Sequence, residues 1–356
     1  MNKRFIKRTW ILICALFVFS STAFSQFSDV DFLRAGIPDG LTYIKAYVSP
    51  WTNAFGAGLD GGWYNSAKPH KLSGFDITAS INAGFVPSSA TTFDVSQIGL
   101  TTLTGTGTAS TVAGPDVEGP TLTASQSGIT LASFRAPPGS DWKIIPAPTL
   151  QAGIGLPFGT ELKVRYLPKI NIHDGDVSLW GVGIMHSILQ YLPGNKLLPF
   201  DVSLFGGYTK LTGNVPIDLQ PEAGAPTNYS QYNPSTSFQD QNMKATVSAM
   251  NVGVIASLNI PVLTVYGGLG YAKTTTEIKL TGNYPLPTIN PAISTTQAVY
   301  EDAGVMKGFS ALKVKDFSGL RANIGLRVKL AFITIHADYT RAHYNVVSTG
   351  LGVSFR

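Results

Sequence analysis

Apolar residues alternate with small or polar ones over the last ten positions of the chain. One face would carry Val347, Thr349, Leu351, Val353 and Phe355, and the other Ser348, Gly350, Gly352, Ser354 and Arg356. A period of two puts alternate side chains on opposite faces of a β-strand. An apolar outer face with a polar inner face is typical of a membrane β-barrel, although this stretch alone also fits the edge strand of a soluble sandwich.

The same alternation recurs along the chain and predicts ten strands. They cover residues 75–85, 150–156, 161–166, 177–189, 202–208, 252–258, 263–271, 320–330, 333–340 and 347–356. Connections at one end of these strands are short and those at the other end are long, which is the expected asymmetry of an outer-membrane barrel. We therefore expect an all-β fold, an antiparallel transmembrane β-barrel of 10 strands, or up to 14 if segments 93–101, 121–134 and 309–315 join the wall.

The turn Pro157-Phe158-Gly159 sets the register of the second and third strands. Proline presets the first turn residue and glycine accepts a left-handed conformation, as three-residue hairpin loops require. The turn pairs Gly155 with Glu161, Gly153 with Lys163, and Gln151 with Arg165. All six side-chain positions then face the lumen, so the turn and the apolar pattern agree.

The chain divides into three segments. Residues 1–25 have four basic residues, an apolar run at 10–19 and a small-x-small site at 23–25, the pattern of a secretory signal peptide. Residues 26–71 precede the regular alternation, and we interpret them as a plug or hatch with a short helix over 40–48, capped by Asp39 and stopped by Pro50. The alternative is two more wall strands at 41–48 and 54–64. Residues 72–356 form the barrel.

Composition limits the partners and the location. Without the predicted signal peptide, 22 basic and 21 acidic residues leave a net charge of +1, which does not favour a nucleic-acid partner. The single cysteine, Cys14, lies in the signal peptide, which excludes disulfides and thiolate metal sites elsewhere. We expect cleavage of the signal peptide and insertion into the outer membrane of a Gram-negative bacterium, in contact with its lipid. The oligomeric state stays open.

Motifs for catalysis or cofactor binding are weak. Residues 56–61, GAGLDG, match a dinucleotide fingerprint by letter but do not lie between a parallel strand and a helix, so a flexible or closely packed glycine segment is the simpler interpretation. The five histidines show no metal-ligand spacing, and neither HExxH nor GxSxG occurs. A Ser-His-acid site assembled in space is the alternative left open. We expect no enzyme activity, no cofactor and no metal site.

Charged residues that alternate to the inner face are the candidate functional residues. They are Glu161, Lys163, Arg165, Arg321, Arg327, Lys329, His336 and Asp338. They form either a structural polar network or a surface that selects a passing solute, because charges in a lumen must be solvated or paired. A turn at 331–332 pairs Arg327 with His336 and makes Arg327 a diagonal neighbour of Asp338. We predict an ion pair between these two, with His336 beside it.

Two stretches carry family resemblances. Residues 61–87, GGWYNSAKPHKLSGFDITASINAGFVP, and the LPFG turn at 156–159 resemble an uncharacterised outer-membrane β-barrel family of Gram-negative bacteria, a domain of unknown function. The plug-like segment followed by Tyr64-Asn65-Ser66-Ala67 is similar to the long-chain fatty-acid transporter family. Phe355 resembles the aromatic C-terminal signal of outer-membrane barrels, with Arg356 as a departure from a terminal aromatic residue.

The leading functional prediction is passive transport of a small solute, with a hydrophobic solute as one option. The alternative is a non-transporting structural or surface-interaction barrel that acts through its extracellular loops. Lumen width separates the two, because eight to ten strands leave an interior mostly filled by side chains, whereas about 14 can hold a ligand passage.

Overall fold

Ten antiparallel strands close into a barrel in a computed structural model that describes residues 37–172, 174–193, 199–221, 227, 238–297, 299–302 and 312–355. In barrel order they are β1 (Phe75–Phe85), β17 (Val346–Phe355), β16 (Ile333–Arg341), β15 (Leu312–Leu330), β12 (Leu263–Thr281), β11 (Asn242–Asn259), β10 (Phe200–Pro216), β9 (Gly175–Ser187), β8 (Thr160–Ile172) and β7 (Ile144–Leu156). The predicted ten-strand barrel is confirmed. The predicted signal peptide, 1–25, lies outside the described residues, as does 26–36 of the predicted plug.

Both strand registers predicted from the turns are present. Gly155 pairs with Glu161 across β7 and β8, and Arg327 pairs with His336 across β15 and β16. Exposure alternates residue by residue along β16, so one face is buried and the other lies outward. The outward face of the neighbouring strand β15 carries large apolar side chains such as Leu320, 82% exposed, and Ile324, 65% exposed. An apolar band of this kind suits contact with lipid.

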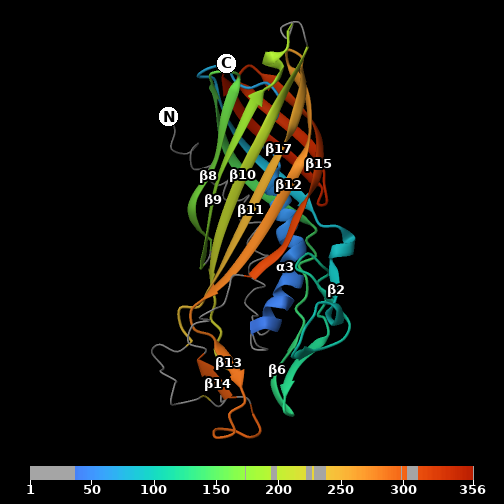
Figure 1. Ribbon diagram of the computed structural model, residues 1–356, viewed down its shortest axis with the longest axis vertical. Coiled ribbons are helices and arrows are strands. Elements are labelled where there is room, and N and C mark those ends of the chain that lie inside the picture. Colours follow the sequence, from blue (N-terminus) through green and yellow to red (C-terminus); the bar gives the residue numbers. More distant parts are fainter. Residues whose placement is uncertain are drawn as a thin grey trace, which may run out of the picture.

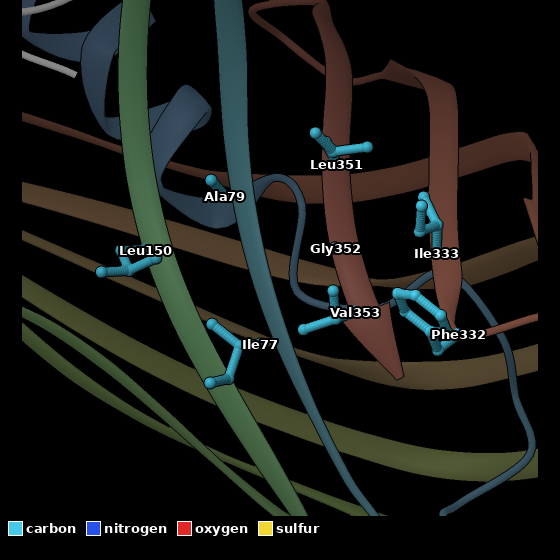
Figure 2. Close-up of a pocket in the computed structure, with 8 residues that line it drawn as sticks. All are labelled: Ile77, Ala79, Leu150, Phe332, Ile333, Leu351, Gly352 and Val353. Atoms are coloured by element: carbon cyan, nitrogen blue, oxygen red, sulfur yellow. The ribbon is translucent and has the colours of Figure 1, made fainter. Parts of the chain in front are cut away.

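Small residues leave a shallow hollow in the apolar band where β1 lies beside β7 and β17 (Figure 2). The hollow has a volume of about 350 Å³. It is lined by Ile77, Ala79, Leu150, Phe332, Ile333, Leu351, Gly352 and Val353. Because the side chains around it are hydrocarbon, membrane acyl chains fit there without leaving a polar group unpaired.

One helix, α3 (Ile37–Asp60), begins among the long loops and enters the barrel (Figure 1). It contacts β1, β7, β10, β11, β12, β15 and β17. The prediction that the helix ends before Pro50 is wrong, as are the alternative wall strands, because the helix continues through Pro50 to Asp60. A mid-helix proline costs about 3 kcal/mol, and burial of residues such as Ala54 and Leu59 in the lumen offsets it. Among the described residues, no helix is long and apolar enough to span a membrane.

The long loops fold into small sheets outside the wall. These sheets are β2 (Thr92–Asp94) with β4 (Thr108–Ser110), β3 (Leu103–Thr104) with β5 (Thr121–Gln126) and β6 (Ile129–Arg135), and β13 (Pro285–Thr288) with β14 (Val299–Asp302). Segments 93–101 and 121–134 therefore add no wall strand. Of 309–315, residues 312–315 extend β15 and 309–311 lie outside the described residues. Short 3-10 turns complete the connections at Ser88–Ala90, Val95–Gln97 and Leu189–Tyr191.

Candidate functional site

The lumen is occupied along its length by α3 and by residues 61–74, which we call the lumen segment. Two wall glycines make room for it, because a Cβ on Gly183 or Gly207 would lie only 2.8 or 2.9 Å from the ring of Trp63. Two glycines of the predicted GAGLDG segment also allow close packing. A Cβ on Gly58 would lie 2.8 Å from Asn82 O, and one on Gly56 would collide with Thr274. Gly56 and Gly58 therefore allow the helix to pack closely against the wall.

Arg165 holds the junction between α3 and the lumen segment. Its side chain is fully buried. Nη1 donates to Leu59 O and Nη2 to Gly61 O, both at 2.7 Å. The guanidinium carbon also lies 3.7 Å from the ring centroid of Trp63, a cation–π contact. The guanidinium donates to carbonyl groups that have no partner within the helix at its C-terminal end. Its positive charge also interacts favourably with the negative end of the helix dipole.

Arg321 acts on the same helix end from the opposite part of the wall. Its Nη1 donates to Asp60 O at 2.8 Å, and the amide of Asn251 donates to the same carbonyl oxygen at 2.8 Å. Gln151 bonds to the neighbouring segment by donating to Trp63 O at 3.1 Å. The charged and amide side chains of three wall strands thus bind the backbone of the occupied lumen.

Arg327 and Asp338 do not form the predicted ion pair, although their backbone register is as predicted. Arg327 donates instead to Asn65 Oδ1 at 3.1 Å and to Thr264 Oγ1 at 3.2 Å. Asp338 accepts a hydrogen bond of 3.0 Å from the hydroxyl of Tyr266. His336 is buried, and neither of its ring nitrogens has a hydrogen-bond partner. The prediction failed because the lumen segment supplies Asn65, which competes for the guanidinium.

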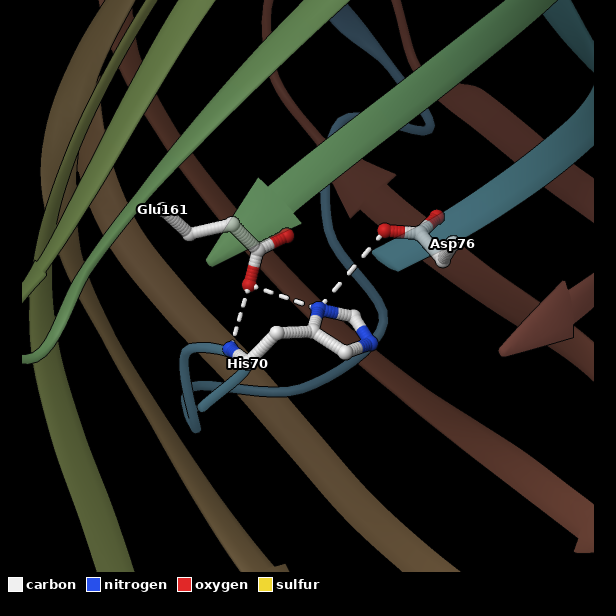
Figure 3. Close-up of side chains that lie close together, drawn as sticks. All are labelled: His70, Asp76 and Glu161. Atoms are coloured by element: carbon white, nitrogen blue, oxygen red, sulfur yellow. Dashed lines mark hydrogen bonds and ion pairs between the residues drawn. The ribbon is translucent and has the colours of Figure 1, made fainter. Parts of the chain in front are cut away.

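Ionisable groups also gather at the short-turn end of the lumen (Figure 3). Glu161 Oε2 accepts from the backbone N–H of His70 at 2.9 Å and lies 3.0 Å from His70 Nδ1. The other Glu161 oxygen, Oε1, pairs with Lys163 Nζ. Lys329 Nζ donates to Ser354 Oγ at 3.2 Å, and the same hydroxyl lies 3.1 Å from His70 Nε2. The predicted residues therefore divide into a group that holds the helix end and a group near the short turns.

The outer end of α3 organises the long loops. Leu41, Tyr43, Ile44, Tyr47 and Val48 belong to one buried cluster with loop residues that include Val95, Leu103, Val112 and Leu122. Together these form an ordered structure that we call the outer cap. The sequence predicted that Asp39 precedes the helix and caps it. In the structure Asp39 lies within the first turn of α3.

The Asp39 carboxylate binds a loop instead of its own helix. It accepts backbone N–H groups from Thr101, Thr102 and Leu103 at 2.6 to 3.0 Å. Burial alone would raise the pKa of Asp39, but these hydrogen bonds outweigh it and lower the pKa from 3.8 to about 2. The ionised carboxylate therefore fixes this loop to the helix at neutral pH.

A space of about 10 Å³ lies between the lumen segment and β10, β11 and β12, beside Tyr64 and Phe205. That volume is at the lower limit for holding one water molecule.

A family model of unknown function, DUF6588, matches residues 3–355. The chain belongs to the DUF6588 family. This membership agrees with the predicted resemblance to an uncharacterised barrel family, while the resemblance of residues 64–67 to fatty-acid transporters stays a prediction. No curated protein matches the chain.

Solved barrels resemble this DUF6588 protein only weakly. The translocator domain of the autotransporter NalP from Neisseria meningitidis is 12% identical, with a TM-score of 0.29, covering 87% of this chain and 96% of that one. The transport unit of AIDA-I from Escherichia coli is 9% identical, with a TM-score of 0.31 and coverages of 87% and 98%. Ail from Yersinia pestis is 8% identical, with a TM-score of 0.26 and coverages of 80% and 99%.

Several residues of the site were not predicted from the sequence. Asp76 alternates to the inner face of the strand 75–85, so the pattern contained its signal. His70 and Trp63 lie before the regular alternation begins, and no periodic pattern marks them. Their positions follow from the path of the lumen segment, which depends on contacts with strands far away in the sequence.

Proposed function

We propose that this DUF6588 protein resides in the outer membrane of a Gram-negative bacterium, stays closed to solutes, and acts at the cell surface through the outer cap. The observation that carries this proposal is the occupied lumen, in which α3 and the lumen segment contact the wall from the long loops to the short turns. The proposal includes no enzyme activity. Lipid of the membrane is the partner expected for the apolar band.

Passive transport of a small solute, the other function predicted from the sequence, would require the end of α3 and the lumen segment to move. Arg165 and Arg321 together donate three hydrogen bonds to the backbone at Leu59, Asp60 and Gly61. At about 1.5 to 3 kcal/mol for each bond to a charged group, breaking them costs about 5 to 9 kcal/mol. A passage that opens at this cost is rarely populated, since each 1.4 kcal/mol is about a factor of ten.

Conductance tests the closed state. We expect the intact protein in planar lipid bilayers to give no steady current steps. The double variant Arg165→Ala with Arg321→Ala should leak, because it loses the bonds that hold the helix end. Arg135→Ala is the matched control, since the Arg135 side chain is 67% exposed and pairs with Glu118 on the outer cap. Steady pores in the intact protein would contradict the closed state and favour transport.

Cysteine labelling on whole cells tests the surface role. Val117 is exposed in the outer cap, and Phe158 is 83% exposed at the short turns. A membrane-impermeant maleimide should label Val117→Cys but not Phe158→Cys in intact cells, and both after lysis. The unsubstituted chain, whose one cysteine is Cys14, gives the background. The reverse labelling pattern would contradict a role of the cap at the cell surface.

A further inference from the structure

Three side chains from separate parts of the chain bring potential metal ligands together near the short turns (Figure 3). His70 comes from the lumen segment, Asp76 from β1 and Glu161 from β8. His70 Nδ1 lies 3.0 Å from Glu161 Oε2 and 3.7 Å from Asp76 Oδ1. One ligand atom of each residue lies within 4.8 Å of the others, and all three residues are largely buried.

The strand between the two carboxylates leaves space for this cluster. Asp76 pairs with Gly153 on β7, and Gly155 on β7 pairs with Glu161. A Cβ on Gly153 would collide with Asp76 Oδ1 and lie 2.9 Å from Glu161 Oε1. Glycine at this position therefore keeps open the space into which both carboxylates point.

One oxygen of the cluster has no hydrogen-bond partner. Asp76 is only 6% exposed, and its Oδ2 accepts from Thr78 Oγ1 at 3.0 Å. Its Oδ1 is buried without a hydrogen bond, and the ammonium of Lys163 lies 3.8 Å away. A buried carboxylate oxygen without a donor is costly, so this atom lacks the ligand that would stabilise it.

The outer ring nitrogen of His70 has the support that metal-binding histidines usually have. His70 Nε2 lies 3.1 Å from Ser354 Oγ, which also accepts from Lys329 Nζ at 3.2 Å. A proton on Nε2 donated to this hydroxyl oxygen leaves the lone pair of Nδ1 directed at the two carboxylates. In this tautomer three electron-rich atoms face one another, and a cation bound between them would stabilise all three.

We propose that His70 Nδ1, Asp76 Oδ1 and Glu161 Oε2 bind a divalent transition-metal ion of the Zn²⁺ class. Two ligands at about 2.0 to 2.1 Å from a tetrahedral ion lie about 3.3 Å apart, a value between the two His70 separations of 3.0 and 3.7 Å. Lys163 pairs with Glu161 Oε1 and so leaves Oε2 to the metal. The ion links the lumen segment to β1 and β8, and water completes its coordination. This inference does not depend on the proposed function.

Zn²⁺ binding to the full-length protein in detergent tests the site. After equilibration with Zn²⁺ and desalting, elemental analysis should find one equivalent in the wild type. Asp76→Asn and Glu161→Gln should bind at least about tenfold more weakly, whereas Lys163→Gln should bind more tightly because a competing cation is removed. His186→Gln is the matched control, since His186 contacts Thr160 and Tyr191 at the same end.

His70→Gln decides the outcome if the carboxylate variants do not fold, because His70 lies outside the wall strands. Loss of the bound Zn²⁺ in this folded variant supports the site. Wild-type protein that binds no Zn²⁺, or a folded His70→Gln variant that binds it equally well, overturns the proposal. If the Lys163→Gln variant binds Zn²⁺ but the wild type does not, the proposal is also overturned, because Lys163 then blocks the site in the native chain. Conductance in bilayers tests the closed state and Zn²⁺ binding tests the metal site. Either proposal can therefore be refuted while the other stands.

Discussion

Replacing Arg165 by alanine should destabilise the protein more than replacing the exposed Arg135 of the outer cap by alanine. The variant loses two hydrogen bonds of 2.7 Å to Leu59 O and Gly61 O and the cation–π contact with Trp63. Each hydrogen bond to a charged group contributes about 1.5 to 3 kcal/mol. Removing the guanidinium also removes the free-energy cost of burying its charge, which offsets part of this loss. We expect a loss of about 3 to 5 kcal/mol in the free energy of unfolding.

Urea unfolding in detergent micelles, followed by tryptophan fluorescence, measures this loss. Arg135→Ala is the control, because an exposed ion pair contributes about 0 to 1 kcal/mol. Far-UV circular dichroism before unfolding establishes that the barrel is formed in both variants. Equal unfolding midpoints for Arg165→Ala and Arg135→Ala would refute the reasoning, because the buried guanidinium would then contribute no more than an exposed one.

Three further outcomes are expected. Ile324→Arg on the lipid face should cost about 2 to 4 kcal/mol in folding assays, whereas Ile324→Val should cost under about 1.5; similar losses would contradict the face assignment. Gly183→Ala should destabilise by about 1 to 3 kcal/mol because the new methyl group meets Trp63, and Gly213→Ala, with its nearest neighbour at 3.8 Å, should not. Because the folded pKa of Asp39 is lowered from 3.8 to about 2, its contribution to stability is present above pH 4 and lost toward pH 2. The protection of the amides of residues 101–103 against hydrogen exchange, taken relative to their intrinsic exchange rates at each pH, should fall over that range, and Asp39→Asn should remove this fall.

The wall of the barrel was predictable because its pattern is local. A period of two identifies the strands. The turns at 157–159 and 331–332 fix their registers, because the paired residues are only a few positions apart in the sequence. Gly155 with Glu161 and Arg327 with His336 followed from these rules alone. The inward direction of all the predicted charged residues follows from the same alternation.

The contacts of the lumen could not be predicted in this way. Arg327 bonds to Asn65, which is more than 260 positions away in the chain, so no local rule relates the two. Pro50 predicted a helix end, but burial of the following turn in the lumen outweighed the local cost of the proline. The cluster at His70 likewise needed Glu161 to meet residues 70–76, which lie about 90 positions earlier in the chain.

Disulfide formation between the lumen segment and the wall tests the occupied lumen most directly. Ser66 Oγ and Ser257 Oγ are 3.4 Å apart and buried, one on the lumen segment and the other on β11. Ser66→Cys with Ser257→Cys should form a disulfide in the folded protein, because the tips of the two side chains already meet across this contact. Ser66→Cys with Ser248→Cys, on the other face of β11, should keep free thiols. Free, maleimide-reactive thiols in the first pair would contradict a lumen filled by this segment.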